Sequence, residues 1–264
     1  MSVLIQRDVV PFWQTQDPPS QSIPPGRFQV AIGMEGGRRL GTTWVTTTPM
    51  ASYTAVESTT QLDVGALSKM ARLAGTLFLE TQLTYGPSDT LDEFTFTLDS
   101  GAFSAEVSGA RYDREYACTA TFGRVTKTLT FDGRLSQFLG DSFRPFTYLK
   151  GLHVGQSWRL RLIDPLAMLQ SRSLEFSTQL VRVTRRETIE HAGQRVNCFR
   201  IETDGAIAWA DADGRVLRQQ VRIPFLGTWV LEAEPFNDQA HRLAEKEIRR
   251  LHGKRHPARP KSQA

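Results

Sequence analysis

Along most of the chain between residues 27 and 236, apolar and polar residues alternate, so that an apolar residue recurs at every second position. In the stretch around Thr95, for example, Phe94 and Phe96 would share one face of a strand while Thr95 lies on the other. A period of two is typical of β-strands that bury one face. This pattern, together with runs of β-branched and aromatic residues, predicts strands at 29–34, 40–46, 77–85, 92–98, 116–122, 126–131, 157–163, 175–184, 194–202, 207–210, 216–223 and 228–234.

Short turn sequences separate the predicted strands. The pair Gly36-Gly37 is typical of a hairpin, and Asp213-Gly214 is a turn sequence of a related kind. The regular alternation of strand and helix that a parallel sheet requires is not seen. An open sheet of about a dozen strands must curl, close or split. Residues 27–236 are therefore predicted to form a mainly β domain, a large curved antiparallel sheet shaped as a half-barrel or open barrel.

The two ends of the chain differ from this domain. Residues 1–26 predict an extended N-terminal arm and a proline-rich linker, and Val9–Trp13 would form a short docking strand within it. Residues 237–264 predict a C-terminal amphipathic helix that ends near Leu251 and is followed by a basic disordered tail. Apolar residues at helical spacing are Phe236, Ala240, Leu243, Ala244, Ile248 and Leu251. Docking of this stripe on the sheet is the simplest explanation, and an interfacial membrane helix is the alternative.

Composition and charge narrow the class of protein. With 264 residues, 40% of them hydrophobic, the chain is neither wholly disordered nor a disulfide-dense miniprotein. Apolar runs stay below the roughly 18 to 20 residues of a membrane-spanning helix. The net charge is +4, yet residues 241–264 alone contain eight Lys and Arg residues and two Glu residues. Such a tail can bind an anionic surface or a protein partner, and it carries no specific nucleic-acid motif.

The sequence contains no familiar catalytic or metal-binding motif. His-Glu-x-x-His, Cys-x-x-Cys, Gly-x-Ser-x-Gly, phosphate-binding and dinucleotide-binding patterns are all absent. The sequence therefore predicts a protein that is not an enzyme and that uses no cofactor and no metal. A hydrolase that assembles distant acids is the alternative. The carboxylates available to it are Asp89, Asp92 and Glu93, Glu187 and Glu190, and Asp211 and Asp213.

The two cysteines, Cys118 and Cys198, are far apart in the chain, and the sequence does not decide whether they form a disulfide. Cys118 alternates in phase with Tyr116, Ala120 and Phe122, so we expect it to be a small buried hydrophobic residue.

Two arginines alternate with apolar residues in the strand predicted at 157–163. Trp158 and Leu160 would face one way, and Arg159 and Arg161 the other. If these arginines lined a concavity, they would bind a carboxylate or phosphate head group through forked hydrogen bonds. If they faced outward, they would form the solvated side of the sheet, which is the commoner case.

Residues 149–222 resemble a group of uncharacterised bacterial envelope domains. The resemblance rests on Gly-x-x-Trp ending at Trp158, on Glu-x-Ile at 187–189, and on the hairpin Trp-x-Asp-x-Asp-Gly-Arg-x-Leu-Arg at 209–218. This group is similar in architecture to the LolA-like lipoprotein-carrier half-barrels. The resemblance implies a curved antiparallel sheet around an apolar hollow that shelters an acyl chain or another hydrophobic guest. It also implies the bacterial cell envelope or periplasm, although we see no export signal at the N-terminus.

These observations lead to one functional hypothesis and one alternative. The hypothesis is a non-enzymatic binding module that holds a hydrophobic or lipid-like ligand in the hollow of the sheet. The residues expected to bind the ligand are Phe94, Phe96, Leu129, Phe131, Trp158, Leu160, Arg159 and Arg161. The alternative is a structural or interaction protein that docks partners through its N-terminal arm and basic C-terminal helix.

Overall fold

The computed structural model describes residues 24–63, 65, 75–87, 90–100, 103–113, 115–132, 139–141, 146–163, 176–223 and 227–255. Within these strands and the helix, the side chains of residues 131, 132, 139–141, 161–163, 176, 177 and 252–255 are not described. The predicted docking strand Val9–Trp13 lies outside the described residues. In the described part of the chain, no helix is both long and apolar enough to cross a membrane.

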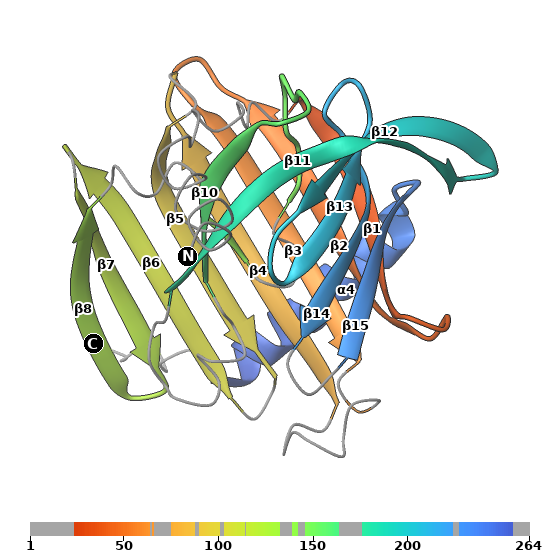
Figure 1. Cartoon of the computed structure of the whole chain (residues 1–264). Coiled ribbons are helices and arrows are strands. Elements are labelled where there is room, and N and C mark those ends of the chain that lie inside the picture. Colours follow the sequence, from red (N-terminus) through yellow and green to blue (C-terminus); the bar gives the residue numbers. More distant parts are fainter. Residues whose placement is uncertain are drawn as a thin grey trace, which may run out of the picture.

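Fifteen strands form one curved sheet in the order β8-β7-β6-β5-β4-β3-β2-β1-β15-β14-β13-β12-β11-β10-β9 (Figure 1). All neighbouring strands are antiparallel except β9, which lies parallel to β10. The strands are β1 Gly26–Met34, β2 Arg39–Pro49, β3 Thr54–Asp63, β4 Thr76–Tyr85, β5 Leu91–Asp99, β6 Ser104–Tyr112, β7 Glu115–Phe122, β8 Val125–Asp132, β9 Leu139–Asp141, β10 Ser157–Ile163, β11 Phe176–His191, β12 Gln194–Glu202, β13 Ala206–Ala210, β14 Val216–Ile223 and β15 Gly227–Glu234. The prediction of a mainly β, curved antiparallel sheet with a C-terminal helix is confirmed, and the sheet is open rather than closed into a barrel.

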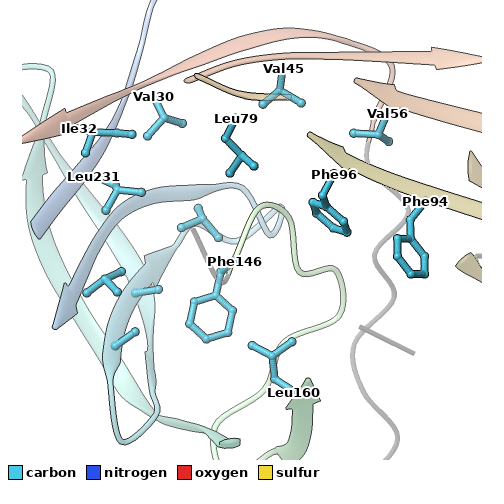
Figure 2. Packing of buried hydrophobic residues seen from close by; sticks show 14 of the residues in the cluster. Val30, Ile32, Val45, Val56, Leu79, Phe94, Phe96, Phe146, Leu160 and Leu231 are labelled. Atoms are coloured by element: carbon cyan, nitrogen blue, oxygen red, sulfur yellow. The ribbon is translucent and has the colours of Figure 1, made fainter. Parts of the chain in front are cut away.

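The two halves of the sheet bury their inner faces against each other. Val45 and Phe96 from the first half pack in one cluster with Val181, Ile201 and Leu231 from the second. Figure 2 shows part of this cluster, where side chains from strands far apart in the sequence point into a common interior. The prediction that Cys118 is buried on the same strand face as Tyr116 and Phe122 is confirmed, since all three side chains are buried.

The C-terminal helix α4 (Asp238–Arg255) covers the outer face of the first half of the sheet. Its Ala244 and Ile248 pack on Trp44 of β2 and Phe78 of β4, so the helix docks on the sheet as the simplest interpretation expects. Two details of the prediction are wrong. Leu243 lies outside this contact and is 61% exposed, because its helical position faces away from the sheet. The helix also continues beyond Leu251, since one glycine costs a helix only about 1 kcal/mol.

Both cysteines are free and buried, and no disulfide joins them. Cys118 belongs to the inner cluster, whereas Cys198 packs with Trp209 and Leu217 in a separate small cluster. Burial raises the pKa of Cys118 to about 12 and that of Cys198 to about 11. The nearby carboxylates of Asp211 and Glu187 add to the effect on Cys198. Neither thiol is a nucleophile at neutral pH, because the thiolate is the reactive form.

Candidate functional site

A short irregular segment places two apolar side chains inside the curved sheet. Phe146 and Leu149 are 2% and 1% exposed and belong to the inner cluster, yet residues 146–149 form no strand of the sheet. Figure 2 shows the Phe146 ring pointing into the interior, with Leu160 to one side and Leu79 and Phe96 to the other. We call residues 146–149 the plug segment, because its side chains occupy the space between the two halves of the sheet.

Strand β14 holds the plug segment in place. The Phe146 N–H donates to Oε1 of Gln219 (3.2 Å), and Nε2 of Gln219 donates to the Phe146 carbonyl (2.7 Å). Gln219 is itself buried, so its amide has no competing water and acts as a substitute for a neighbouring strand. Two residues after Phe146, Tyr148 forms an antiparallel bridge with Arg215. The Leu149 N–H donates to the Gly214 carbonyl (2.8 Å).

The turn between β13 and β14 explains the aspartates of the hairpin motif. Oδ1 of Asp211 accepts hydrogen bonds from the N–H groups of Asp213 (3.0 Å) and Arg215 (2.9 Å). Gly214 has a φ of +91°, and a Cβ at this position would collide with the carbonyl oxygen of Leu149. The carboxylate of Asp211 therefore shapes a turn, and the missing side chain of Gly214 lets the plug segment lie against it.

A cavity of about 230 Å³ lies beside the plug segment. Thr147 and Tyr148 line one side of it, and Phe28, Val216 and Ala233 supply apolar surface. Burial raises the pKa of Tyr148, and the carboxylates of Asp213 and Asp211 raise it further. Tyr148 is therefore a neutral hydrogen-bonding group at this cavity at physiological pH. The cavity lies between the start of β1 and the plug segment.

The structure brings four of the eight predicted ligand-binding residues together in the interior. Phe94, Phe96, Trp158 and Leu160 all belong to the inner cluster, and Leu129 packs against it with part of its side chain exposed. Arg159 is exposed on the opposite face of β10, so it does not share this interior. The side chains of Phe131 and Arg161 lie outside the described residues.

Several polar atoms are buried in or beside this apolar interior. The hydroxyls of Thr43 and Thr60 bond to each other at 2.7 Å. In contrast, Oγ1 of Thr47, Oγ1 of Thr81 and Nε1 of Trp158 have no hydrogen-bond partner in the part of the chain that the structure describes. A buried polar group without a partner costs about 1 to 3 kcal/mol. These atoms would bond favourably to polar atoms of a guest.

The outer face of the second half of the sheet carries a charged cluster around Trp209. Glu187 accepts hydrogen bonds from the Trp209 indole, from Arg185 (2.9 Å) and from Arg200 (3.2 Å). The guanidinium groups of Arg200 and Arg218 lie 5.6 and 5.8 Å from the centre of the Trp209 ring. Burial alone raises the pKa of Glu187, but these hydrogen bonds outweigh it and hold the pKa below its usual value. The cluster pairs its charges internally and offers no free acid–base group.

Sequence reasoning did not find Phe146, Leu149 or Gln219. The plug segment is irregular and has no periodic pattern, and its partner Gln219 lies 73 positions away. The sequence signals in this region are the turn sequence at 211–214 and the resemblance over residues 149–222, and neither indicates that residues 146–149 lie inside the sheet. In the described residues, no group of three or more His, Cys, Asp and Glu side chains could hold a metal ion.

Comparisons with known proteins give little further information. No family model and no curated protein matches the chain. A solved structure with some likeness is a DUF1089 family protein from Pseudomonas aeruginosa, 18% identical, with 70% of this chain and 90% of that chain covered. The TM-score is 0.39, so this likeness carries no argument about fold or function. It does not support a relationship to LolA-like carriers specifically.

Proposed function

We propose that this protein is a non-enzymatic binding protein that holds a lipid-like ligand on the inner face of its curved sheet. The plug segment is the observation that carries the proposal. Phe146 and Leu149 occupy the interior from an irregular segment, and no strand of the sheet has to separate for them to leave. The ligand would take their place against Phe94, Phe96, Trp158 and Leu160.

The free energy gained by burying an acyl chain can offset the free energy lost when the plug segment leaves the interior. The two Gln219 bonds and the Leu149 bond contribute about 1 kcal/mol each. Burial of Phe146 and Leu149 contributes about 1.5 to 3 kcal/mol each. An acyl chain gains about 0.8 kcal/mol for each methylene that it buries, so about ten methylenes would offset the loss of the plug contacts. A ligand of fatty-acid length is therefore the class that we expect.

The polar atoms of the interior favour a ligand that is not purely hydrocarbon. Thr47, Thr81 and Trp158 each have a buried atom without a partner among the described residues, and an ester, amide or hydroxyl group of a lipid would bond to them. The resemblance of residues 149–222 to envelope domains similar to lipoprotein carriers favours the same ligand class. Under this proposal the protein acts in the bacterial cell envelope.

The test is uptake of a fluorescent fatty acid, together with native mass spectrometry of gently purified protein. We expect a lipid adduct in the mass spectrum. The Gln219→Ala variant removes two hydrogen bonds from Phe146, together about 2 kcal/mol, so it should bind the fatty acid about thirtyfold more tightly. Gln220→Ala, on the next residue of β14, is the matched control and should bind as the wild type does. Absence of a lipid adduct, combined with no uptake by wild type or Gln219→Ala, would refute the proposal.

A second candidate is docking on an anionic partner through α4, and the exposed face of that helix favours it. Leu243 is 61% exposed, and Arg242 and Lys246 on the same helix are also exposed, with Glu247 as the acidic residue one turn after Leu243. An apolar residue among basic ones is typical of helices that bind anionic membrane surfaces. Co-sedimentation with vesicles containing phosphatidylglycerol tests this candidate. The double variant Arg242→Glu, Lys246→Glu should abolish binding, and equal binding by wild type and variant would exclude the candidate.

A further inference from the structure

A hollow lies on the outer face of β5–β8, on the side of the sheet opposite the inner cluster. Its volume is about 610 Å³, within the range of about 300 to 1,000 Å³ that is usual for small-molecule sites. Its lining includes a row of directly opposed residues, one from each of four consecutive strands. These are Thr95, Ser108, Thr119 and Thr128. By alternation they face away from Phe94 and Cys118, which are buried on the other side.

Packing on the inner side explains why the hollow forms on the outer side. A Cβ on Gly109 would lie 2.5 Å from the Phe94 ring and 2.8 Å from Sγ of Cys118, so the inner face is filled there. On the outer face, the side chains of Ser108, Ala110 and Ala117 are small, so they leave space above the sheet. Glu93 and Tyr112 also line the hollow, and Tyr112 is 69% exposed.

The chemistry of the hollow restricts its ligand. Hydroxyl groups dominate the lining, and Glu93 supplies a carboxylate. The other outward-facing charged side chains described on β5–β8 include Glu106 and Glu115, and none of those described there is Lys or Arg. This charge disfavours phosphates, nucleic acids and carboxylate ligands. Except for the Tyr112 ring, large apolar groups are absent from the outward side chains of this lining, which disfavours an acyl chain.

We propose that this hollow binds a neutral saccharide. Sugar hydroxyls can both donate to and accept from the threonine and serine hydroxyls, and a carboxylate such as Glu93 accepts from two adjacent sugar hydroxyls at once. The exposed Tyr112 ring offers an aromatic face with a polar end, on which the C–H face of a sugar ring can stack. Four strands spaced about 4.8 Å apart give a row about 14 Å long, suited to a short oligosaccharide. Because this site lies on the opposite face of the sheet, it does not depend on the function proposed above.

The test is a titration of isotope-labelled full-length protein with three neutral trisaccharides, followed by NMR. Maltotriose, cellotriose and triacetylchitotriose differ in linkage and substituents, so they sample the shape of the site. We expect at least one of them to shift the amide signals of Ser108, Thr119 and Thr128. Tyr112→Ala should weaken the binding about tenfold, and Glu93→Gln should weaken it several-fold.

Tyr53→Ala is the matched control, because Tyr53 is an exposed tyrosine that is not part of this hollow. It should leave the affinity unchanged. The proposal is overturned if none of the three sugars shifts these amides at tens of millimolar, or if Tyr53→Ala weakens binding as much as Tyr112→Ala. It is also overturned if a lysine-rich peptide shifts the amides and the sugars do not, since the hollow would then be a site for basic peptides.

Discussion

Gly214 is the single residue on which the position of the plug segment most directly depends. Its φ of +91° lies in the left-handed region, and the carbonyl oxygen of Leu149 occupies the place of a Cβ. The carboxylate of Asp211 accepts a backbone hydrogen bond within the turn, and the plug segment bonds to the turn at the Gly214 carbonyl. A side chain at position 214 would therefore force either the turn or the plug segment to move.

We expect Gly214→Ala to lower the free energy of unfolding by about 3 kcal/mol or more. About 1 to 2 kcal/mol of this comes from the left-handed backbone, and the rest from the collision with Leu149. Gly193→Ala is the matched control, because Gly193 has a φ of +76° but nothing within 4 Å of the added Cβ. That variant should lose only the backbone contribution, about 1 to 2 kcal/mol. Urea denaturation measures both values, and equal losses would show that the contact with Leu149 is unimportant.

Glu187 makes the stability of the outer cluster depend on pH. Hydrogen bonds from Trp209, Arg185 and Arg200 hold its folded-state pKa below the usual value of 4.5. The unfolded chain therefore binds a proton at a higher pH than the folded protein does. The contribution of Glu187 to stability is complete above pH 4.5 and is lost as the pH falls through its lower folded-state value. Thermal unfolding between pH 6 and pH 3 should show a smaller loss of stability for Glu187→Gln than for the wild type. Parallel curves for the two proteins would contradict this assignment.

Single elements differ in how far the sequence predicts them. Residues 194–202 and 216–223 alternate clearly, and β12 and β14 occupy those residues. In contrast, β3 and β6 were not predicted. The inner face of β3 carries Ser58 and Thr60 at core positions, and these hydroxyls hide the alternation of apolar residues. In β6 the inward position 109 is a glycine instead of an apolar side chain, because Phe94 and Cys118 fill the space that a side chain would need.

The candidate site is harder to predict than the strands, because it depends on contacts between segments that are far apart in the chain. The inward face of Phe94, Phe96, Trp158 and Leu160 follows from alternation alone. The plug segment does not, because its place is decided by Gln219 and Gly214 on another part of the chain. The outer hollow likewise depends on the register of four strands, which alternation within one strand cannot give.

The docking of α4 provides a test at the level of one element. Ile248 is buried against Trp44 and Phe78, whereas Leu243 on the same helix is exposed. Ile248→Ala should therefore lower the free energy of unfolding by about 2 to 4 kcal/mol, and Leu243→Ala should change it by less than about 0.5 kcal/mol. Urea denaturation followed by tryptophan fluorescence measures both. A large loss for Leu243→Ala would mean that this side chain is covered in solution.

At the scale of the whole molecule, the sheet consists of two sequential series of strands, β1–β8 and β9–β15. Neighbours within each series follow one another in the chain, and the pairing of β1 with β15 joins the two series (Figure 1). The inner cluster then packs the two series against each other. Strands β2 to β14 all lie between β1 and β15 in the chain, so this pairing closes a long loop and has a correspondingly high entropic cost.

A chain divided between β8 and β9 should therefore reassemble. We expect fragments 1–132 and 133–264, when co-expressed, to co-elute in size-exclusion chromatography with the circular dichroism spectrum of the intact protein. Ile32→Asp places a charge in the buried β1–β15 region and should prevent the association. The exposed position Val125→Asp, on β8, is the control. Two fragments that fold separately and do not associate would refute this view.

The β1–β15 pairing also has a consequence for biosynthesis. A ribosome completes the first eight strands while β15, the neighbour of β1, is still untranslated. Until then β1 has an open edge, and the apolar side chains of the nascent half have no opposite surface to cover them. Unpaired edges of this kind recruit other chains, so the protein should require a chaperone, or slow translation with low expression, for soluble production. The nascent chain is therefore most prone to aggregate in the interval before its last strand is synthesised.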